Sequence, residues 1–369
     1  MIDEAELEAR GLLDPHAPNA AGRLALLRFL EAEGVTLDEM VAAHAVGRLA
    51  AAAGDRLLRP GEACYTLAEA AERAGVSLDS AKAFRRVVGL ASVDPSERQM
   101  SAADEATLRA FNVAVQLFGE RPTLDFSRVL GSALARVAES AISLFLAQVE
   151  HPLLRAGAAE VAIAQANRDA TAAIEVLPVI METFFRRHLE EAVRREARAR
   201  DRDRSAVTVH MAVGFVDLVG FTARTQQLSP AELTVLVRDF EARTQDVVNE
   251  QGGRVVKLIG DEVMFVTLGP RAGCEIALSL VEGFRDDASG VTPRGGVAAG
   301  PLLMHGGDYY GTTVNLASRI ADLAVPFEIL VAPEVAAQAE GFRFEPAGRR
   351  ILKGFAEPLL LYAAGRPVP

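Results

Sequence analysis

Two aspartates stand beside glycine turns in segments that otherwise favour strands. Asp217 lies in segment 215–222 (FVDLVGFT), and Asp261 ends segment 257–261 (KLIGD). A carboxylate at a strand end can hold Mg²⁺, and the backbone N–H groups of a glycine turn can cradle phosphates. Neighbouring strands would bring Asp217 and Asp261 together, and two carboxylates that share two metal ions suit in-line attack at phosphorus. Taken alone, each segment also fits an ordinary strand end or a hairpin corner.

A third segment, residues 308–319 (DYYGTTVNLASR), places polar side chains on an expected helix. Asn315 and Arg319 are four residues apart and therefore share one helix face. A guanidinium such as that of Arg319 can bind phosphate oxygens through two parallel hydrogen bonds. On an isolated helix, the same two residues would more commonly be ordinary solvated side chains.

The elements that must position these side chains begin near residue 205, where the hydrophobic pattern changes. Alternation over 207–215 predicts a strand, and Ser229 followed by Pro230 predicts the start of a helix that ends near Glu250. Further segments predict a hairpin of strands 254–259 and 263–267, a helix at 272–284, a strand at 294–299 and a helix from about 314. Mixed elements of this kind predict an α+β sandwich with a largely antiparallel sheet.

In this order, the three segments resemble the class III adenylyl cyclase family over residues 207–364. The resemblance implies a ferredoxin-like α/β sandwich that converts ATP to 3′,5′-cyclic AMP and pyrophosphate, a lyase reaction of intracellular signalling. It also implies two Mg²⁺ or Mn²⁺ ions per site, bound by Asp217 and Asp261. The family arranges its sites in a head-to-tail homodimer, in which each site takes residues from both chains.

The resemblance assigns the remaining site residues one by one. Lys257 and Asp308 match the residues that read adenine, and Asn315 and Arg319 match those that stabilise the transition state. The counterpart of a lysine that contacts the terminal phosphates is Lys353. The turn N–H groups that would cradle phosphate belong to Gly220, Phe221 and Thr222. Adenine offers an amino donor beside a ring-nitrogen acceptor, which suits a carboxylate and an ammonium, whereas guanine presents the opposite pattern.

The half of the chain before residue 205 is rich in Ala, Leu, Glu and Arg and has helical spacing almost throughout. Leu24, Leu27 and Leu30 share a face, residues 129–149 form a long apolar helix expected at the centre of a core, and residues 177–200 form another long helix. Residues 201–204 are expected to be a solvated linker. We predict a helical regulatory domain at 1–176, a linker helix at 177–205 and a catalytic domain at 206–369.

Segment 65–90 has the pattern of a helix-turn-helix, with Lys82, Arg85 and Arg86 on its second helix. A DNA-binding regulator is therefore one alternative for this chain, and a catalytically silent cyclase-like binding or dimerisation module is another. The segment has four basic and three acidic residues, a net charge of only +1, and the whole chain has a net charge of −11. We therefore expect no nucleic-acid partner.

The N-terminal half is also similar to the autoregulatory domain of mycobacterial pH-sensing adenylyl cyclases, in the Gly75-Val76 turn, segment 87–91 and the Arg187-His188 helix. The resemblance implies autoinhibition that acid pH relieves through the helix at 177–200. His188, between two arginines and two glutamates, is the candidate pH switch. The alternative is a solvated histidine whose titration has no consequence. A small-molecule or lipid ligand of this domain stays open.

The composition is that of a globular protein, with 50% hydrophobic and 24% charged residues. Cys64 and Cys274 are far apart, so we expect buried, reduced thiols. The acidic N-terminus lacks the apolar segment of a signal peptide. Arg136 and Glu139 interrupt the most apolar window, 130–149, so we expect no membrane span and a cytoplasmic location.

Overall fold

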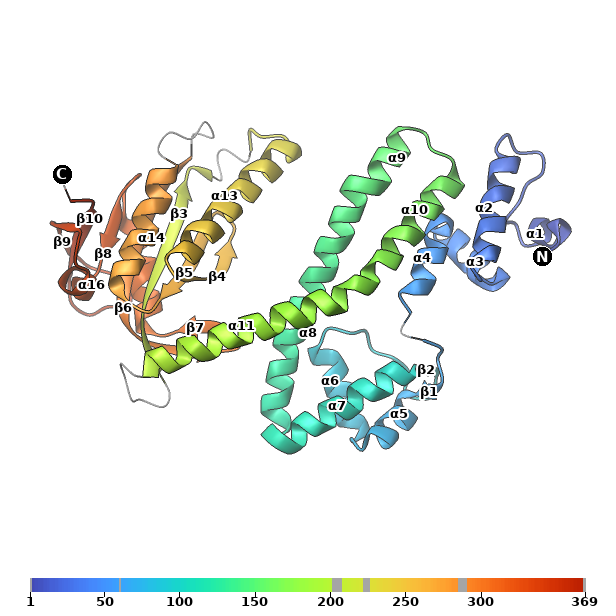
Figure 1. Cartoon of the computed structure of the whole chain (residues 1–369), viewed down its shortest axis with the longest axis horizontal. Helices are drawn as coiled ribbons and strands as arrows, with labels where there is room; N and C mark the ends of the chain where they lie inside the picture. Colours follow the sequence, from blue (N-terminus) through green and yellow to red (C-terminus); the bar gives the residue numbers. More distant parts are fainter. Residues whose placement is uncertain (1, 60, 201–207, 222–225, 285–290, 368–369) are drawn as a thin grey trace. The chain divides into compact units, whose positions relative to one another are not determined.

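The computed structural model describes residues 2–59, 61–200, 208–221, 226–284 and 291–367. The chain forms two compact units, Met1–Phe185 and Arg186–Pro369. Figure 1 shows helices in the first unit and a sheet with flanking helices in the second. The predicted α+β class, a helical N-terminal half followed by an α/β sandwich, is confirmed.

Five helices of the first unit surround one leucine-rich core. They are α1 (Glu4–Ala9), α2 (Ala20–Ala32), α3 (Leu37–Ala45), α4 (Ala52–Leu57) and α10 (Glu160–Ala172). Leu27 and Leu30 of α2 are buried as predicted, and Leu26 is buried beside them, while Leu24 is only partly buried. The helix α10 returns from later in the chain to pack against α2 and α4.

A second core holds the predicted helix-turn-helix. It contains β1 (Tyr65–Thr66), α5 (Leu67–Ala74), α6 (Leu78–Val87), β2 (Arg98–Met100) and α7 (Ala102–Phe118). The side chains of Thr66 and Ser77 cap α5 and α6, and Gly75 joins the two helices with a φ of +74°, which a residue with a Cβ rarely adopts. The helix-turn-helix shape is therefore confirmed. Cys64, just before β1, is exposed, so its predicted burial is wrong.

The apolar helix predicted at 129–149 lies within α8 (Glu120–Phe145), a π-helical turn (Leu146–Glu150) and α9 (His151–Arg155). Its predicted central place in a core is wrong. Its buried residues are small ones, Thr123, Ser127 and Gly131, because α8 approaches α6 closely there. Its large apolar side chains are exposed instead, for example Leu144 at 65%.

The same helical stretch, Glu120–Arg155, is long and apolar enough to cross a membrane, with a mean hydropathy of 1.5 in its most apolar window. Arg136 and Glu139 do not offset the surrounding leucines, alanines and valines. The prediction of no membrane span is therefore not confirmed, and the cytoplasmic location stays a prediction. Length and composition alone give this result, and the core helix of a soluble protein can be equally long and apolar.

The last helix before the sheet, α11, begins at Leu177 as predicted and is described as far as Arg200. Glu190 pairs with Arg194 one turn later, which supports an isolated charged helix. The rest of the predicted linker helix, 201–205, and with it the solvated linker predicted at 201–204, lies outside the described residues.

The second unit is built on an eight-stranded sheet in the order β4-β5-β3-β6-β8-β10-β9, with β7 paired to β6. The strands are β3 (Thr208–Val219), β4 (Arg254–Ile259), β5 (Glu262–Thr267), β6 (Thr292–His305), β7 (Asp308–Tyr310), β8 (Ile329–Val331), β9 (Arg343–Arg350) and β10 (Leu359–Gly365). Only β6 and β8 run parallel, which confirms a largely antiparallel sheet.

Helices cover both faces of this sheet. Side chains of α13 (Pro230–Glu250), α14 (Pro270–Gly283) and α16 (Pro333–Gln338) share one core with Val216 and Leu218 of β3. Side chains of α15 (Thr312–Leu323) share the other core with Val213 and Phe215. Because strand side chains alternate between faces, Asp217 belongs to the α15 face. Cys274 of α14 is buried as predicted, and burial raises the pKa of its thiol to about 12.

Candidate active site

The end of β3 and the tip of the β4–β5 hairpin bring the two motif aspartates together. Asp217 lies opposite Glu262 in the ladder, and the backbone N–H of Leu218 donates to the carbonyl of Asp261 at 3.2 Å. Gly260, at the first position of the hairpin turn, has a φ of +67°. Asp261 does not share that conformation, so the turn fits type II′.

A third carboxylate, that of Glu262, joins this pair. Burial is the largest cause that raises the pKa of Glu262, and the negative charges of Asp217, Asp322 and Asp261 add to it. Although Arg294 lowers it, the net result is a pKa of about 7. Burial and the charge of Asp217 also raise the pKa of Asp261. Glu262 was missed in the sequence, although its place directly after Asp261 and opposite a strand-end aspartate would have revealed it once the register was known.

Arg294 of β6 is the cation of this cluster. Its Nε and Nη2 donate to Oδ2 of Asp217 at 3.3 and 3.2 Å. Its Nη1 donates to the carbonyls of Asp322 and Ala324 at 2.9 and 3.1 Å. One side chain therefore joins Asp217 to the C-terminal end of α15. No motif marked Arg294, because its role depends on the β3–β6 register.

The donor set fits a divalent cation that is shared with a substrate. Mg²⁺ is usually held by one or two carboxylates together with substrate phosphates. The described residues contain no group of three or more potential metal-ligating side chains, as an all-protein cage would require. Asp217 and Asp261 supply two hard oxygen donors. Burial is the main cause that raises the pKa of Asp261 and of Glu262, and neighbouring carboxylates add to it, so a bound cation would favour their ionised forms.

Lys257 of β4 and Asp308 of β7 form a second pair. Nζ of Lys257 lies 2.6 Å from Oδ2 of Asp308, and the other oxygen of Asp308 accepts a 2.7 Å hydrogen bond from the backbone N–H of Tyr309. The side chain of Lys257 is 40% exposed and that of Asp308 is 24% exposed, so a ligand can reach both. Nearby, Arg254 donates to the carbonyl of Gly307 at 2.9 Å, which ties the two segments together.

Asn315 and Arg319 lie on the exposed face of α15, as their spacing predicted. Arg319 pairs with Asp322 at 3.1 Å. Within the described part of the chain, neither Asn315 nor Arg319 forms a hydrogen bond or ion pair with Asp217 or Asp261. The helix lies very close to the sheet: a Cβ at Gly296 of β6 would be only 2.3 Å from the backbone nitrogen of Ala321.

The other candidate residues are more scattered. Gly220 has a φ of +83°, Phe221 packs partly buried against the core, and Thr222 lies outside the described residues. Lys353 is exposed in a turn between β9 and β10, anchored by the buried Leu352. His188 is exposed on α11.

Two family descriptions match this chain. "Adenylate cyclase regulatory domain" matches residues 5–193, and "Adenylate and Guanylate cyclase catalytic domain" matches residues 205–363. The two matches together span almost all of the chain.

Individual relatives agree with these families. An uncharacterized protein of Mycobacterium tuberculosis is 36% identical over 98% of this chain and 94% of its own length. A Streptomyces coelicolor protein named adenylate cyclase is 34% identical over 79% of this chain and 76% of its own length. A Mycobacterium tuberculosis protein named pH-sensitive adenylate cyclase is 32% identical over 94% of this chain and 88% of its own length. The solved adenylyl cyclase CyaB of P. aeruginosa is 25% identical over 43% of this chain and 95% of its own, with a TM-score of 0.39. The chain therefore belongs to the class III adenylate and guanylate cyclases, with an adenylate cyclase regulatory domain before the catalytic domain.

Proposed function

We propose that this chain is an adenylyl cyclase that converts ATP to 3′,5′-cyclic AMP and pyrophosphate. The observation that carries the choice of ATP is the pair Lys257–Asp308. Asp308 accepts from the amino group of adenine, and Lys257 donates to the neighbouring ring nitrogen. Guanine would set its carbonyl against the carboxylate and its N–H against the ammonium, which leaves both side chains badly paired.

In the reaction, the ribose 3′-hydroxyl loses its proton to solvent, its oxygen bonds to the α-phosphorus, the bond from that phosphorus to the bridging oxygen breaks, and pyrophosphate leaves. Asp217 and Asp261 would hold two Mg²⁺ or Mn²⁺ ions, which would lower the pKa of the 3′-hydroxyl and offset phosphate charge. Asn315 orients the ribose, and Arg319 stabilises charge on the phosphorus oxygens. Lys353 and the backbone at Gly220, Phe221 and Thr222 bind the phosphates.

Each active site combines two chains in a head-to-tail homodimer. Support comes from α15, whose Asn315 and Arg319 are exposed and, within the described residues, form no hydrogen bond or ion pair with the aspartate pair of their own chain. Apolar side chains around the site are also exposed, as a contact surface for a second chain would require. These side chains are Ile259, Leu303, Met304, Tyr310 and Ile351.

The N-terminal half regulates the cyclase. We place the regulatory domain at 1–176, a linker helix that includes α11 at 177–205 and the catalytic domain at 206–369. The relative named as a pH-sensitive adenylate cyclase matches 94% of this chain, which supports proton control and autoinhibition through α11. His188 is the proposed pH switch, since it is exposed on α11 and histidine is the residue type that most commonly serves as a proton sensor in proteins.

The test measures cyclic nucleotide production by the full chain from ATP and from GTP, with Mn²⁺ or Mg²⁺, over a series of pH values. We expect cyclic AMP as the main product, with activity lost in Asp217→Ala. His188→Gln should flatten the pH profile, whereas the matched variant His44→Gln should not. Cyclic GMP as the main product would contradict the choice of ATP. An unchanged pH profile in His188→Gln would remove the role of that histidine only.

A further inference from the structure

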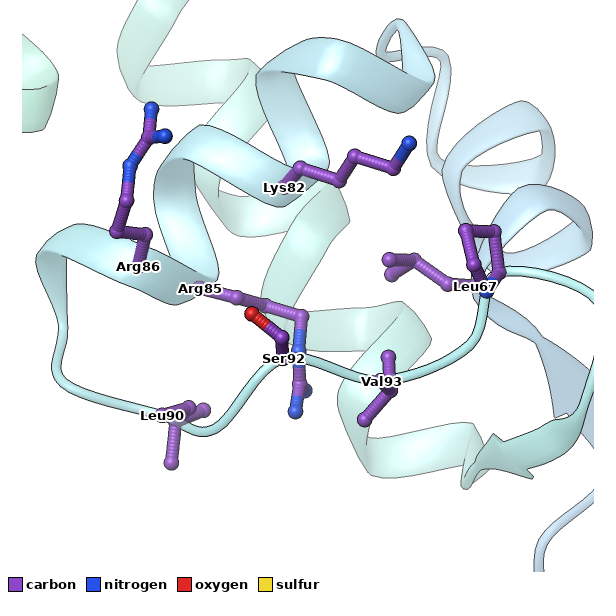
Figure 2. Close-up of a pocket in the computed structure, with 8 residues that line it drawn as sticks. Leu67, Lys82, Arg85, Arg86, Leu90, Ser92 and Val93 are labelled. Atoms are coloured by element: carbon purple, nitrogen blue, oxygen red, sulfur yellow. The ribbon is translucent and has the colours of Figure 1, made fainter.

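A cavity of about 310 Å³ lies between α6 and the loop that follows it in the regulatory unit (Figure 2). Three of its lining side chains are cationic, those of Lys82, Arg85 and Arg86, and no lining side chain is acidic. Leu67 and Val93 add apolar wall. Its size is at the lower end of the range for small-molecule sites.

Arg85 is the anchored cation of the cavity. Its Nη2 donates to the carbonyl of Ala91 at 3.0 Å, and Nη1 contacts Sδ of Met100 at 3.6 Å. Figure 2 shows its side chain reaching from α6 to the loop at Ser92. Its Nε is buried and has no hydrogen-bond partner among the described residues, and no carboxylate there pairs with the guanidinium. Partial burial of a charge without a counter-ion is unfavourable, so binding of an anion beside this guanidinium would be favoured.

Lys82 and Arg86 extend the positive charge. They are four residues apart on α6 and therefore share one helix face, with exposed ends (Figure 2). Within the described residues, neither forms an ion pair. The two acids of the loop are engaged locally. Asp94 accepts hydrogen bonds from the backbone N–H and the hydroxyl of Ser96, and Glu97 accepts one from the side-chain amide of Gln99. In a chain with a net charge of −11, three cations without acidic partners form an unusual local excess.

We propose that this cavity binds a small molecule that carries a phosphate monoester. A phosphate dianion matches several positive charges better than a single carboxylate does, and the fork of a guanidinium suits its oxygens. Leu67 and Val93 contact the organic part of the ligand. This binding site is separate from the proposed active site and does not depend on cyclase activity.

DNA is the competing ligand, because α6 is the second helix of the helix-turn-helix. A recognition helix presents its base-reading side chains outward to the major groove. Arg85 instead turns back onto its own loop, and the segment 65–90 has a net charge of only +1. The cavity and the buried Nε therefore favour a small anion.

Isothermal titration of the full chain with glycerol 3-phosphate tests the proposal, with glycerol as the neutral control. Phosphatidic acid vesicles, against phosphatidylcholine vesicles, show whether the phosphate comes from a lipid headgroup. We expect saturable binding of one phosphate source, weakened about tenfold or more in Lys82→Gln/Arg86→Gln. The matched control is Arg121→Gln, an exposed arginine of the same unit that does not line the cavity, and it should bind as wild type does.

These surface variants are preferred to Arg85→Gln, which removes a contact of the fold, and circular dichroism checks that each variant is folded. The proposal is overturned if neither phosphate source binds saturably, or if binding survives in the double variant or weakens equally in Arg121→Gln. Fluorescence anisotropy with duplex DNA completes the test, since binding of DNA alone would assign the cations to nucleic acid. All readouts are binding measurements, so a failure of the proposed cyclase reaction would not alter them.

Discussion

Lys257 and Asp308 are 51 residues apart in the chain, and their side chains meet at 2.6 Å. The ammonium and the carboxylate already compensate one another before any base is bound. A base that enters must therefore replace this ion pair with hydrogen bonds of equal quality. Adenine offers the complementary donor and acceptor and guanine does not, so the proposed base-binding pair would also discriminate between the two bases.

Asp308→Asn is the first test of this filter. An amide can donate as well as accept, so we expect kcat/KM for ATP to fall about 10- to 100-fold and the preference for ATP over GTP to narrow. Steady-state kinetics with both nucleotides measure this change. Asp246→Asn, an exposed aspartate of α13, is the matched control and should leave both values unchanged. A retained preference in Asp308→Asn would show that other residues choose the base.

The proposed active site, built from two chains, predicts complementation between two inactive variants. Asp217→Ala removes a metal ligand, and Arg319→Ala removes the transition-state contact, so neither homodimer should be active. In a mixture whose chains exchange freely, about half the dimers are mixed and each holds one intact site, which gives roughly a quarter of wild-type activity. Activity that stays at the level of the separate variants, despite demonstrated exchange, would contradict a site built from two chains.

Arg294 should stabilise the carboxylate cluster. Arg294→Gln removes the cation beside Asp217 and the two bonds to the end of α15, so we expect a loss of roughly 1–3 kcal/mol in the free energy of unfolding. Added Mn²⁺ should recover more of the thermal stability in this variant than in wild type, because the metal replaces the lost charge. Differential scanning calorimetry with and without metal measures both effects. If Mn²⁺ raises the thermal stability of both proteins equally, Arg294 does not offset the negative charge of the carboxylate cluster.

Much of the fold and of the site was predictable from local patterns. Ser229 and Pro230 mark the start of α13 through N-cap chemistry, and the spacing of Asn315 and Arg319 defines one helix face. The pairs Asp217–Asp261 and Lys257–Asp308 were identified through family motifs, and the strand register then placed the members of each pair together.

The features that were missed depend on contacts between distant segments. Glu262 and Arg294 gain their roles only because both lie opposite Asp217 in the ladder, which no local pattern encodes. The prediction that α8 lies at the centre of a core was wrong for a related reason. Its apolar composition predicts a helix but not what covers it, and small residues such as Gly131 make its contact with α6.

Because α15 lies close to the sheet, a substitution beneath this helix should change the position of the site residue Arg319. A Cβ at Gly296 would lie 2.3 Å from the backbone of Ala321, so Gly296→Ala must push α15 outward. We expect a fall in stability of about 1–3 kcal/mol and a larger loss in kcat than in KM, because Arg319 is displaced. Gly283→Ala is the control, since its Cβ would meet no atom within 4 Å. Wild-type kinetics in Gly296→Ala would mean that α15 can shift without moving Arg319.

Glu262 predicts how stability depends on pH when chelator has removed divalent metal. Its pKa is about 7 in the folded protein and near 4.5 in the unfolded chain, so between these values the folded state holds a proton that the unfolded state has lost. Its contribution to stability is therefore fully present below about pH 4.5 and is lost as pH rises through about 7. Glu262→Gln should remove this part of the pH dependence, so that stability falls less than in wild type between about pH 5 and about pH 8. Urea unfolding at both pH values measures the difference, and Glu241→Gln, an exposed glutamate of α13, is the control. If the free energy of unfolding falls equally in wild type and in Glu262→Gln, the buried proton is held by another group of the cluster.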